Sequence, residues 1–485
     1  MKLFMLIAAV TLPLCAACNP HTLMPPTPDP NRSTHNEFPT SLENKLDVLF
    51  MVDNSSSMAP LQAKLVSQFK SFMDPLKRVP TPDGSGTALP NIHVAVVSSD
   101  TGPGTAEGPK FGSNWRGDQG QFQFQPHAPC TTSPLHTTPA QQTFLSASMN
   151  QTVTNFDGDI SDAFGCIAAL GDQGFGFEGQ LKSVRWALDP FHTPDTNVGF
   201  LRDDATLAVV LITNEDDCSL PDDSDLTDPD QKLVSDPLGS FWSFRCNEFG
   251  HLCNINGTLQ PPPRGPADHL QGCVSNETPS GRLTKVGDEV AFLKGLKSDP
   301  SRIVVAAITG LPTDYSIEMI KTDKDVEYHP NIKPSCGVES GEHGDPAVRI
   351  MQWVNAFGDR GLAKSICGDN FQDALSTIAN RILISIGPQC VSGPLLDSDP
   401  TTPELDPECQ VMDVFTDAQR HENQTALQAC AVDPTPPCWS LVDDAKCPGA
   451  KRLDVTRAGG SVPDDLHTTI SCSLCIPGVA RPGCP

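Results

Sequence analysis

The chain has 485 residues and carries 33 Lys and Arg against 59 Asp and Glu, which gives a net charge of −26. This acidity argues against nucleic acid and anionic membrane surfaces as partners. The length suffices for one large domain and a smaller one. If Cys15 leaves with a signal peptide and Cys18 carries lipid, sixteen of the 18 cysteines remain (18 − 2), an even number typical of disulfides in an exported protein.

Residues 1–17 have the features of a targeting segment. Lys2 gives a positive start, an apolar run follows, and small Ala17 precedes Cys18. The run is too short to span a bilayer. The ending LCAAC resembles a bacterial lipobox, with Cys18 as the lipidated residue and Cys15 as the weaker candidate. An ordinary signal peptide cleaved nearby is the alternative.

Residues 18–44 are predicted to form a tether. The part from 21 to 39 is rich in Pro, Ser, Thr and Asn and has too few apolar residues to bury a core. We expect it to be extended and to hold the folded part away from the membrane.

The stretch 46–58, LDVLFMVDNSSSM, is the most informative in the chain. Val48–Val52 is a short apolar run typical of a parallel strand buried on both faces. The run stops at Asp53, and a candidate amphipathic helix occupies residues 61–76. Residues 53–57 are therefore expected where a strand ends and a helix begins, which is the edge of an open α/β sheet where ligands bind.

Asp53, Ser55 and Ser57 offer one carboxylate and two hydroxyls at two-residue spacing. Oxygen donors that converge in this way suit a hard cation such as Mg²⁺ or Mn²⁺. The alternative is that these side chains only cap the next helix. The pattern is the DxSxS element of the von Willebrand factor A family, which the chain resembles here. The resemblance implies a doubly wound, mostly parallel, Rossmann-like sheet and a bound metal whose open position accepts an Asp or Glu of a protein ligand.

The segments that follow alternate between the two types of secondary structure. The predicted strands are 91–98, 205–213 and 302–309, and the predicted helices are 159–170, 177–188, 286–296, 347–357 and 370–383. This order predicts an α/β domain over 45–386 with helices on both faces of a parallel sheet. Residues 120–125 alternate apolar and polar side chains and are predicted to form a half-exposed edge strand.

The chain departs from the family pattern at two positions. The loop 171–179 has no Thr; the Thr position falls near Gly176, and Glu178 is the nearest oxygen donor. Asn214 takes the place of the second metal-binding Asp. Asp216 is therefore predicted as an additional metal ligand, and Asp217 is a further candidate. The alternative for these acids is a solvated turn.

A long insertion occupies residues 219–282. Cys218, Cys246, Cys253 and Cys273 are expected to staple it as two disulfides of unassigned pairing, and it is either a rim of the binding surface or a stapled ornament. Farther along the chain, Cys336 and Cys367 are expected to pair.

Residues 387–485 contain eight cysteines and few apolar runs, which predicts a small β module stapled by disulfides. The CxxC spacing of Cys472 and Cys475 lies in this tail rather than at a helix start, which disfavours a redox or zinc site. His251 and His343 lack the HExxH pattern and are expected to be surface histidines. No GxSxG and no phosphate-binding loop occurs, so we expect no enzyme activity.

The sequence thus predicts an exported lipoprotein of the bacterial cell envelope, at the outer membrane or cell surface. Its expected role is protein binding or adhesion that depends on Mg²⁺ or Mn²⁺, with a lipid anchor in the membrane and no nucleic acid partner. The first alternative is a metal-free structural scaffold. The second is a metal-assisted hydrolase, for which no base or nucleophile set is visible.

Overall fold

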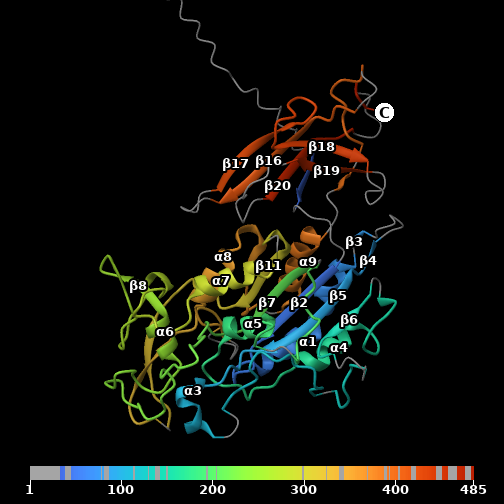
Figure 1. Cartoon of the computed structure of the whole chain (residues 1–485). Coiled ribbons are helices and arrows are strands. Elements are labelled where there is room, and N and C mark those ends of the chain that lie inside the picture. The colour runs from blue at the N-terminus through green and yellow to red at the C-terminus, as the bar shows by residue number, and fades with distance from the viewer. Residues whose placement is uncertain are drawn as a thin grey trace, which may run out of the picture.

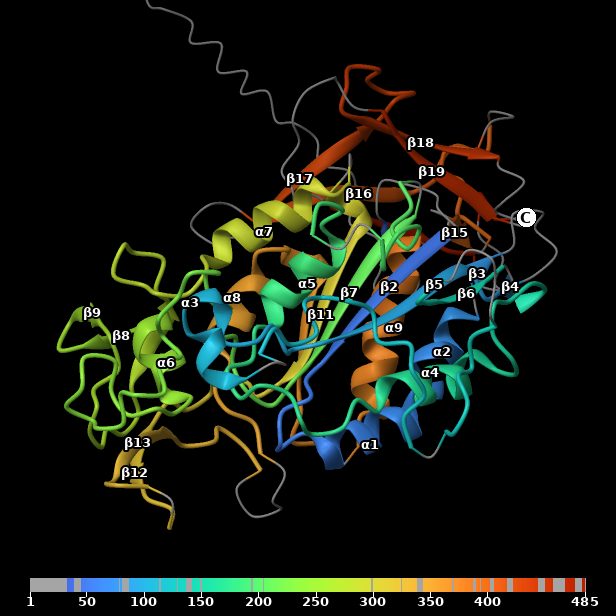
Figure 2. The same cartoon turned by 60° about the horizontal axis from the view of Figure 1, so that its bottom comes forward.

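The computed structural model describes residues 33–38 and 45–484. Its internal gaps are 78, 81–86, 113–114, 129, 137–141, 149–150, 193–194, 204, 298–299, 324, 338–342, 369, 387–389, 393, 402–404, 417–421, 444–449, 457–466 and 476–481. The predicted signal segment, Cys18 and most of the tether lie outside the described residues. Figures 1 and 2 show a helix-covered sheet, a lobe beside it that contains β8, and a separate β-sheet formed mainly by the C-terminal strands.

A six-stranded sheet forms the centre of the large domain. Its order is β14-β11-β7-β2-β5-β6, and its strands are β2 (Lys45–Val52), β5 (Asn91–Ser98), β6 (Leu145–Ala147), β7 (Thr206–Ile212), β11 (Ile303–Thr309) and β14 (Gly361–Ser365). All neighbouring strands are parallel except β5 and β6. The chain therefore forms a mixed α/β fold built on a mainly parallel sheet, as the alternating pattern predicts.

Helices cover both faces of this sheet because successive side chains of a buried strand point to opposite sides. Phe50 of β2 belongs to one apolar core and Met51 to the other. The first core receives α1 (Ala59–Gln68), α2 (Lys70–Leu76), α4 (Ile160–Ala168) and α9 (Gln372–Ile386), and the second receives α5 (Gln180–Leu188), α7 (Val286–Gly295) and α8 (Val348–Asn355). Figure 2 shows α9 and α5 on opposite sides of the sheet.

The predicted edge strand at 120–125 is wrong, because these residues have no strand conformation. Phe122 is buried and packs 5.0 Å from the ring of Phe200. The alternating residues therefore form a loop that places the Phe122 ring in the core. The edge position belongs to β6, which pairs with β5 through Ile92↔Ala147.

The insertion and a neighbouring hairpin form the lobe beside the sheet. The insertion contains α6 (Phe244–Gly250) and a small sheet of β8 (His251–Ile255), β9 (Thr258–Gln260) and β10 (Gln271–Ser275). The hairpin pairs β12 (Ile317–Ile320) with β13 (His329–Ile332). Disulfides Cys218–Cys246 and Cys253–Cys273 confirm the two expected staples. The predicted Cys336–Cys367 pair is also confirmed.

The C-terminal region forms a seven-stranded sheet in the order β1-β20-β16-β17-β18-β19-β15. Its strands are β15 (Cys390–Ser392), β16 (Cys409–Thr416), β17 (Glu422–Ala429), β18 (Cys438–Asp443), β19 (Ala450–Thr456) and β20 (His467–Ser473), together with β1 (Ser33–Phe38). Residues 33–38, expected to belong to an extended tether, instead pair with β20 from Ser33↔Ser473 to Phe38↔Thr468. Local composition missed this strand because its pairing partner lies more than four hundred residues away.

Three disulfides staple the C-terminal sheet among the residues that the structure describes: Cys409–Cys472, Cys430–Cys438 and Cys475–Cys484. Cys472 and Cys475 thus bond to different partners, so the CxxC spacing is not a redox pair. With Cys130–Cys166 in the large domain, the described residues hold seven disulfides, which is typical of an exported protein.

None of the described helices is both long and apolar enough to cross a bilayer. The large domain also contains the short elements β3 (Val79–Pro80), β4 (Thr87–Ala88) and α3 (Gly104–Glu107).

Glu289 of α7 makes stability depend on pH. Burial raises the pKa of this carboxyl to about 7, although the Arg185 guanidinium 3.5 Å away lowers it. A raised folded-state pKa favours the neutral acid, so stability falls as pH rises from about 4.5 through 7. The free energy of unfolding of Glu289→Gln should therefore exceed that of the parent by about 3 kcal/mol at pH 8, and the two values should be equal below pH 4.5. Chemical denaturation across this range, with exposed Asp288→Asn as control, checks this; equal profiles would contradict it.

Candidate functional site

The strand register brings three polar residues together at one edge of the sheet. Val52 of β2 lies opposite Ser98 of β5 and Ile212 of β7. The next residue along each parallel strand therefore lies at the same level. These three residues are Asp53, Ser99 and Thr213, and all are buried.

The Asp53 carboxylate is fixed by this alignment. Its Oδ1 accepts a hydrogen bond from the Ser55 amide at 2.8 Å and from the Ser99 hydroxyl at 3.0 Å. Its Oδ2 accepts one from the Thr213 hydroxyl at 2.6 Å. Burial raises the pKa of Asp53, and these hydrogen bonds lower it in part. Asp53 is thus a positioned but poorly solvated carboxylate.

The two serines after Asp53 reach the turn that follows β7. The Ser55 and Ser57 hydroxyl oxygens lie 3.4 Å apart. The Ser57 hydroxyl donates to Oδ1 of Asn214 at 3.0 Å, a contact between residues 157 positions apart in the chain. The structure therefore places Asp53, Ser55, Ser57 and Asn214 close together, and metal binding by these residues stays a prediction.

The loop 171–179 closes the site from the side of α5. Gly174 donates its amide to the Asn54 carbonyl at 2.8 Å, and a Cβ at Gly174 would overlap the Asn54 side chain. This close approach requires glycine. Gly176, the expected Thr position, is open, and a Cβ there would meet only the Glu178 carboxyl oxygen, 4.0 Å away.

Glu178 supplies a buried acid from the same loop, only 2% exposed. Burial raises its pKa well above the ordinary value, and the neighbouring Glu215 and Asp53 carboxylates raise it further. Glu215, partly exposed, has a pKa raised to about 7 by burial and by Asp53. The Glu178 side chain hydrogen-bonds that of Glu215, a contact that requires a proton on one of the two carboxyl groups. Sequence reasoning named Glu178 only as the nearest donor and missed its pairing with Glu215.

Asp216, predicted as a further metal ligand, points elsewhere. Its Oδ2 lies 2.7 Å from Nε2 of His251 and accepts the Arg349 amide at 2.9 Å, and its Oδ1 accepts the Ile350 amide at 3.1 Å. The carboxylate thus caps the N-terminus of α8 and binds the insertion. Its pKa is lowered by the His251 bond and these amides, against the effect of burial. The structure gives Asp216 no contact with Asp53 or the two serines.

Asp217 is also committed to the fold rather than to solvent. Its Oδ1 accepts the Leu181 amide at the start of α5, at 2.9 Å, and the Ser219 hydroxyl at 2.6 Å. Its Oδ2 pairs with the Arg349 guanidinium at 2.9 Å, and both side chains are fully buried. The alternative of a solvated acidic turn is therefore wrong, because this turn anchors α5, α8 and the insertion.

The two histidines expected on the surface are not free surface residues. His251 is buried, with Nδ1 2.8 Å from the Tyr315 hydroxyl and Nε2 on Asp216. His343 is half-buried, and its Nε2 lies 3.3 Å from Nδ2 of Asn214. Burial lowers the pKa of His343, which favours the neutral ring. His343 therefore borders the site on the side opposite Ser57.

The residues at this edge fit a hard cation by their chemistry. Ser55, Ser57 and Asn214 offer neutral oxygens, and the Asp53 carboxylate lies behind them with Glu178 and Glu215 nearby. The Asp53 charge raises the pKa of both Glu178 and Glu215, so the three acids lie close together, and a cation bound beside them would stabilise their ionised forms. Among the described residues, no group of three or more His, Cys, Asp or Glu side chains is arranged to hold a metal. A site here would therefore depend on hydroxyl and amide ligands.

Comparisons with known proteins give little information. No family model and no curated protein sequence matches the chain. Two solved structures are similar over most of its length. The pilus adhesin SpaC from Lactobacillus rhamnosus GG, in an open conformation, has 12% identity and a TM-score of 0.27, covering 92% of this chain and 43% of that one. The human COPII-coat protein Sec24c has 8% identity and a TM-score of 0.27, covering 91% and 46%. The chain spans less than half the length of either protein.

Proposed function

We propose that this exported protein is a lipoprotein whose large domain binds a protein partner through Mg²⁺ or Mn²⁺ held at Asp53, Ser55, Ser57 and Asn214. The observation that carries the proposal is the 3.0 Å contact from Ser57 to Asn214, because it joins the DxSxS loop to the turn after β7. The strand order and the helices on both faces support a doubly wound fold like that of the von Willebrand factor A family.

Each residue has a separate task in this proposal. Ser55 and Ser57 supply hydroxyl oxygens, Asn214 supplies an amide oxygen or holds a water, and Asp53 balances charge from behind. The bound ion would act as a Lewis acid that accepts a carboxylate oxygen from the partner. Ser99 and Thr213 keep Asp53 oriented, since they bind its two oxygens. No bond of the partner is broken.

The partner is proposed to be a protein that presents an Asp or Glu side chain. The chain's charge of −26 would repel an acidic group, and a divalent ion at the contact removes part of this repulsion. The same charge disfavours nucleic acid. Recognition would then combine one charge-assisted contact with an ordinary protein interface around it.

A lipid anchor at Cys18 would hold the protein in the bacterial envelope, at the outer membrane or the cell surface. Bacterial lipoproteins carry several acyl chains, which makes anchoring stable. Cys18→Ala is expected to move the protein from the membrane pellet to the soluble fraction of lysed cells, with Cys15→Ala as the matched control. Retention of the Cys18→Ala protein in the pellet would contradict the anchor.

A metal-free scaffold is the second candidate. The observation that favours it is that the Asp53 carboxylate already accepts three hydrogen bonds from protein groups. Asn214 in place of Asp and Gly176 in place of Thr also remove two family-type ligands. A metal-assisted hydrolase ranks third, and activity on peptide, ester or phosphate substrates that disappears in Asp53→Ala would favour it.

Calorimetric titration of Mg²⁺ and Mn²⁺ into the oxidised protein lacking residues 1–18 separates the first two candidates. The proposal predicts saturable binding that Asp53→Ala abolishes, because the ion loses its only charged support in the DxSxS loop. Asp172→Asn is the matched control, since this exposed acid lies in the loop 171–179 without touching Asp53. Absence of binding in the parent protein would favour the scaffold.

A further inference from the structure

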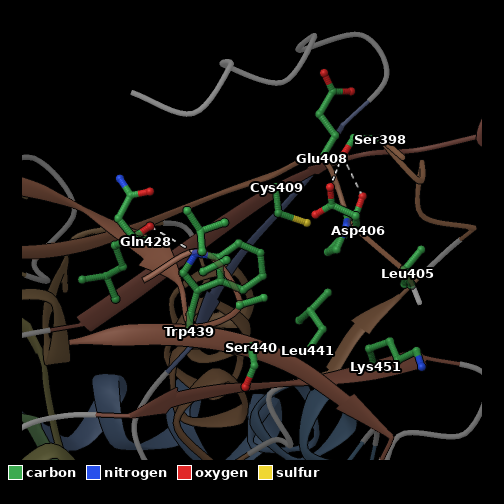
Figure 3. A pocket seen from close by; sticks show the side chains of 15 residues that line it. Ser398, Leu405, Asp406, Glu408, Cys409, Gln428, Trp439, Ser440, Leu441 and Lys451 are labelled. Atoms are coloured by element: carbon green, nitrogen blue, oxygen red, sulfur yellow. Dashed lines mark hydrogen bonds between the residues drawn. The ribbon is translucent and has the colours of Figure 1, made fainter. Parts of the chain in front are cut away.

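A cavity of about 640 Å³ lies in the C-terminal sheet, far along the chain from the DxSxS loop. It lies where the end of β17 pairs with the start of β18, through Gln428↔Cys438 and Ala429↔Trp439. The volume falls within the range of roughly 300–1,000 Å³ that is typical of small-ligand sites. Figure 3 shows Trp439 and Leu441 facing this hollow, with Asp406 across from them.

The inner wall of the cavity is apolar. Trp439 is 5% exposed, and its indole N–H donates to the Leu427 carbonyl at 3.1 Å. The only polar atom of the indole thus has a protein partner, and the small exposed part of the ring adds apolar surface to the cavity wall. Leu427, Leu441 and Cys409 extend the apolar wall, and the Cys409–Cys472 disulfide fixes it. A rigid aromatic wall of this kind favours an apolar body or a cation over its face.

The rim of the cavity carries an excess of negative charge. Asp406 and Glu408 are the two acids that line the cavity, and Lys451 is the one basic residue among the lining residues. The Asp406 carboxylate is held by the Ser398 hydroxyl at 2.8 Å (Figure 3). The one lining cation, Lys451, pairs with Asp443 at 2.8 Å, so its charge is balanced outside the cavity.

We propose that this cavity binds an organic cation with an apolar body, with the ammonium or guanidinium group at Asp406 and the apolar part against Trp439. A free amine and a Lys or Arg side chain of a peptide share this chemistry. The cavity shares no lining residue with the proposed metal site at Asp53, Ser55, Ser57 and Asn214, so the two proposals are tested independently. It would give the C-terminal module a binding role of its own.

Fluorescence titration of the full, disulfide-intact chain tests the proposal, since Trp439 is the only Trp in residues 387–485. The probes are 4-phenylbutylammonium, the neutral 4-phenylbutanol and the anionic 4-phenylbutyrate, with N-acetyl-Phe-Lys-amide as the peptide arm. Trp439→Phe identifies the origin of the signal. Calorimetry in parallel measures the same affinities without a fluorescent reporter.

The amine is expected to saturate the protein and to bind about tenfold more tightly than the alcohol, because it gains a charge-assisted contact. The carboxylate should bind most weakly. Asp406→Asn should reduce amine binding to the level of the alcohol and leave alcohol binding unchanged. Asp454→Asn, which removes an equal charge from β19 outside the lining, should change neither by more than about twofold.

Two results would overturn the proposal: no saturable binding of any probe, or equal affinities for amine and alcohol that Asp406→Asn does not alter. Tighter binding of the free amine supports a small-molecule ligand, and tighter binding of the peptide supports a basic protein segment. An unchanged near-ultraviolet circular dichroism spectrum shows that Asp406→Asn keeps its fold. Asp406 is exposed at the rim, so we expect its substitution to leave the fold intact.

Discussion

Arg349→Met is expected to lower the free energy of unfolding by about 3–5 kcal/mol, since removing one partner leaves the other charge buried and unpaired. The Arg349 side chain is fully buried and donates to Asp217, to the Ser275 hydroxyl at 2.8 Å and to the Thr284 carbonyl at 2.7 Å. Its loss therefore leaves the Asp217 carboxylate without a counter-charge and two further acceptors without a donor. Denaturant unfolding of the oxidised protein measures the effect.

The control for this variant is Lys70→Met, which breaks the exposed pair with Asp74 in α2. Exposed pairs spaced i, i+4 contribute only about 0.3–0.5 kcal/mol. If Arg349→Met cost no more than this control, the turn after β7 would not anchor α5 and α8. Its buried acids would then need another explanation.

Asp53→Asn is expected to change stability in opposite directions with and without metal. Burial raises the pKa of Asp53 in the folded protein. The folded protein therefore loses stability as the pH rises above about 4, the ordinary pKa of an Asp carboxyl, because ionisation of the buried group is unfavourable. The neutral amide removes this cost and keeps the shape. Without metal, the variant should therefore be more stable than the parent at pH 7.

With Mn²⁺ at about one hundred times its Kd, the parent should gain about 2.7 kcal/mol from ligand binding, and Asp53→Asn should gain almost nothing. Denaturant unfolding with and without Mn²⁺, after removal of trace metal by chelator, measures both effects. Equal stabilisation of parent and variant by Mn²⁺ would place the binding site elsewhere. The Asp172→Asn protein should behave as the parent does.

The parts of the fold that sequence predicts well are those fixed by local pattern. Val48–Val52 and its counterparts are apolar throughout, as parallel strands buried on both faces must be, and the structure places them in the central sheet. The resemblance to the von Willebrand factor A family implies that Asn214 lies near the DxSxS loop, and the Ser57 hydroxyl contacts Asn214 in the structure. The mixed α/β fold with a mainly parallel sheet therefore follows from local pattern, whereas metal binding at this edge stays a prediction.

The errors arise where a distant partner decides the outcome. The composition of residues 33–38 predicts a tether, but in the structure these residues form a strand that pairs with β20. The sequence suggests that the acids after Asn214 are solvated. In the structure they are buried and bind the Arg349 guanidinium, the His251 ring and backbone amides at two helix N-termini. His343 has no local signal that places it beside Asn214. A polar residue type reports its chemistry, whereas its burial depends on packing that the local sequence does not encode.

Anomalous scattering from a crystal grown or soaked with Mn²⁺ tests the central claim most directly. The account predicts one strong anomalous peak at the carboxyl edge of β2 and β7, within bonding distance of the Ser55 and Ser57 hydroxyl oxygens and beside Asn214. The same experiment on Asp53→Ala should show no peak there. A well-ordered DxSxS loop with no Mn²⁺ in the parent protein would contradict the account and favour a metal-free scaffold.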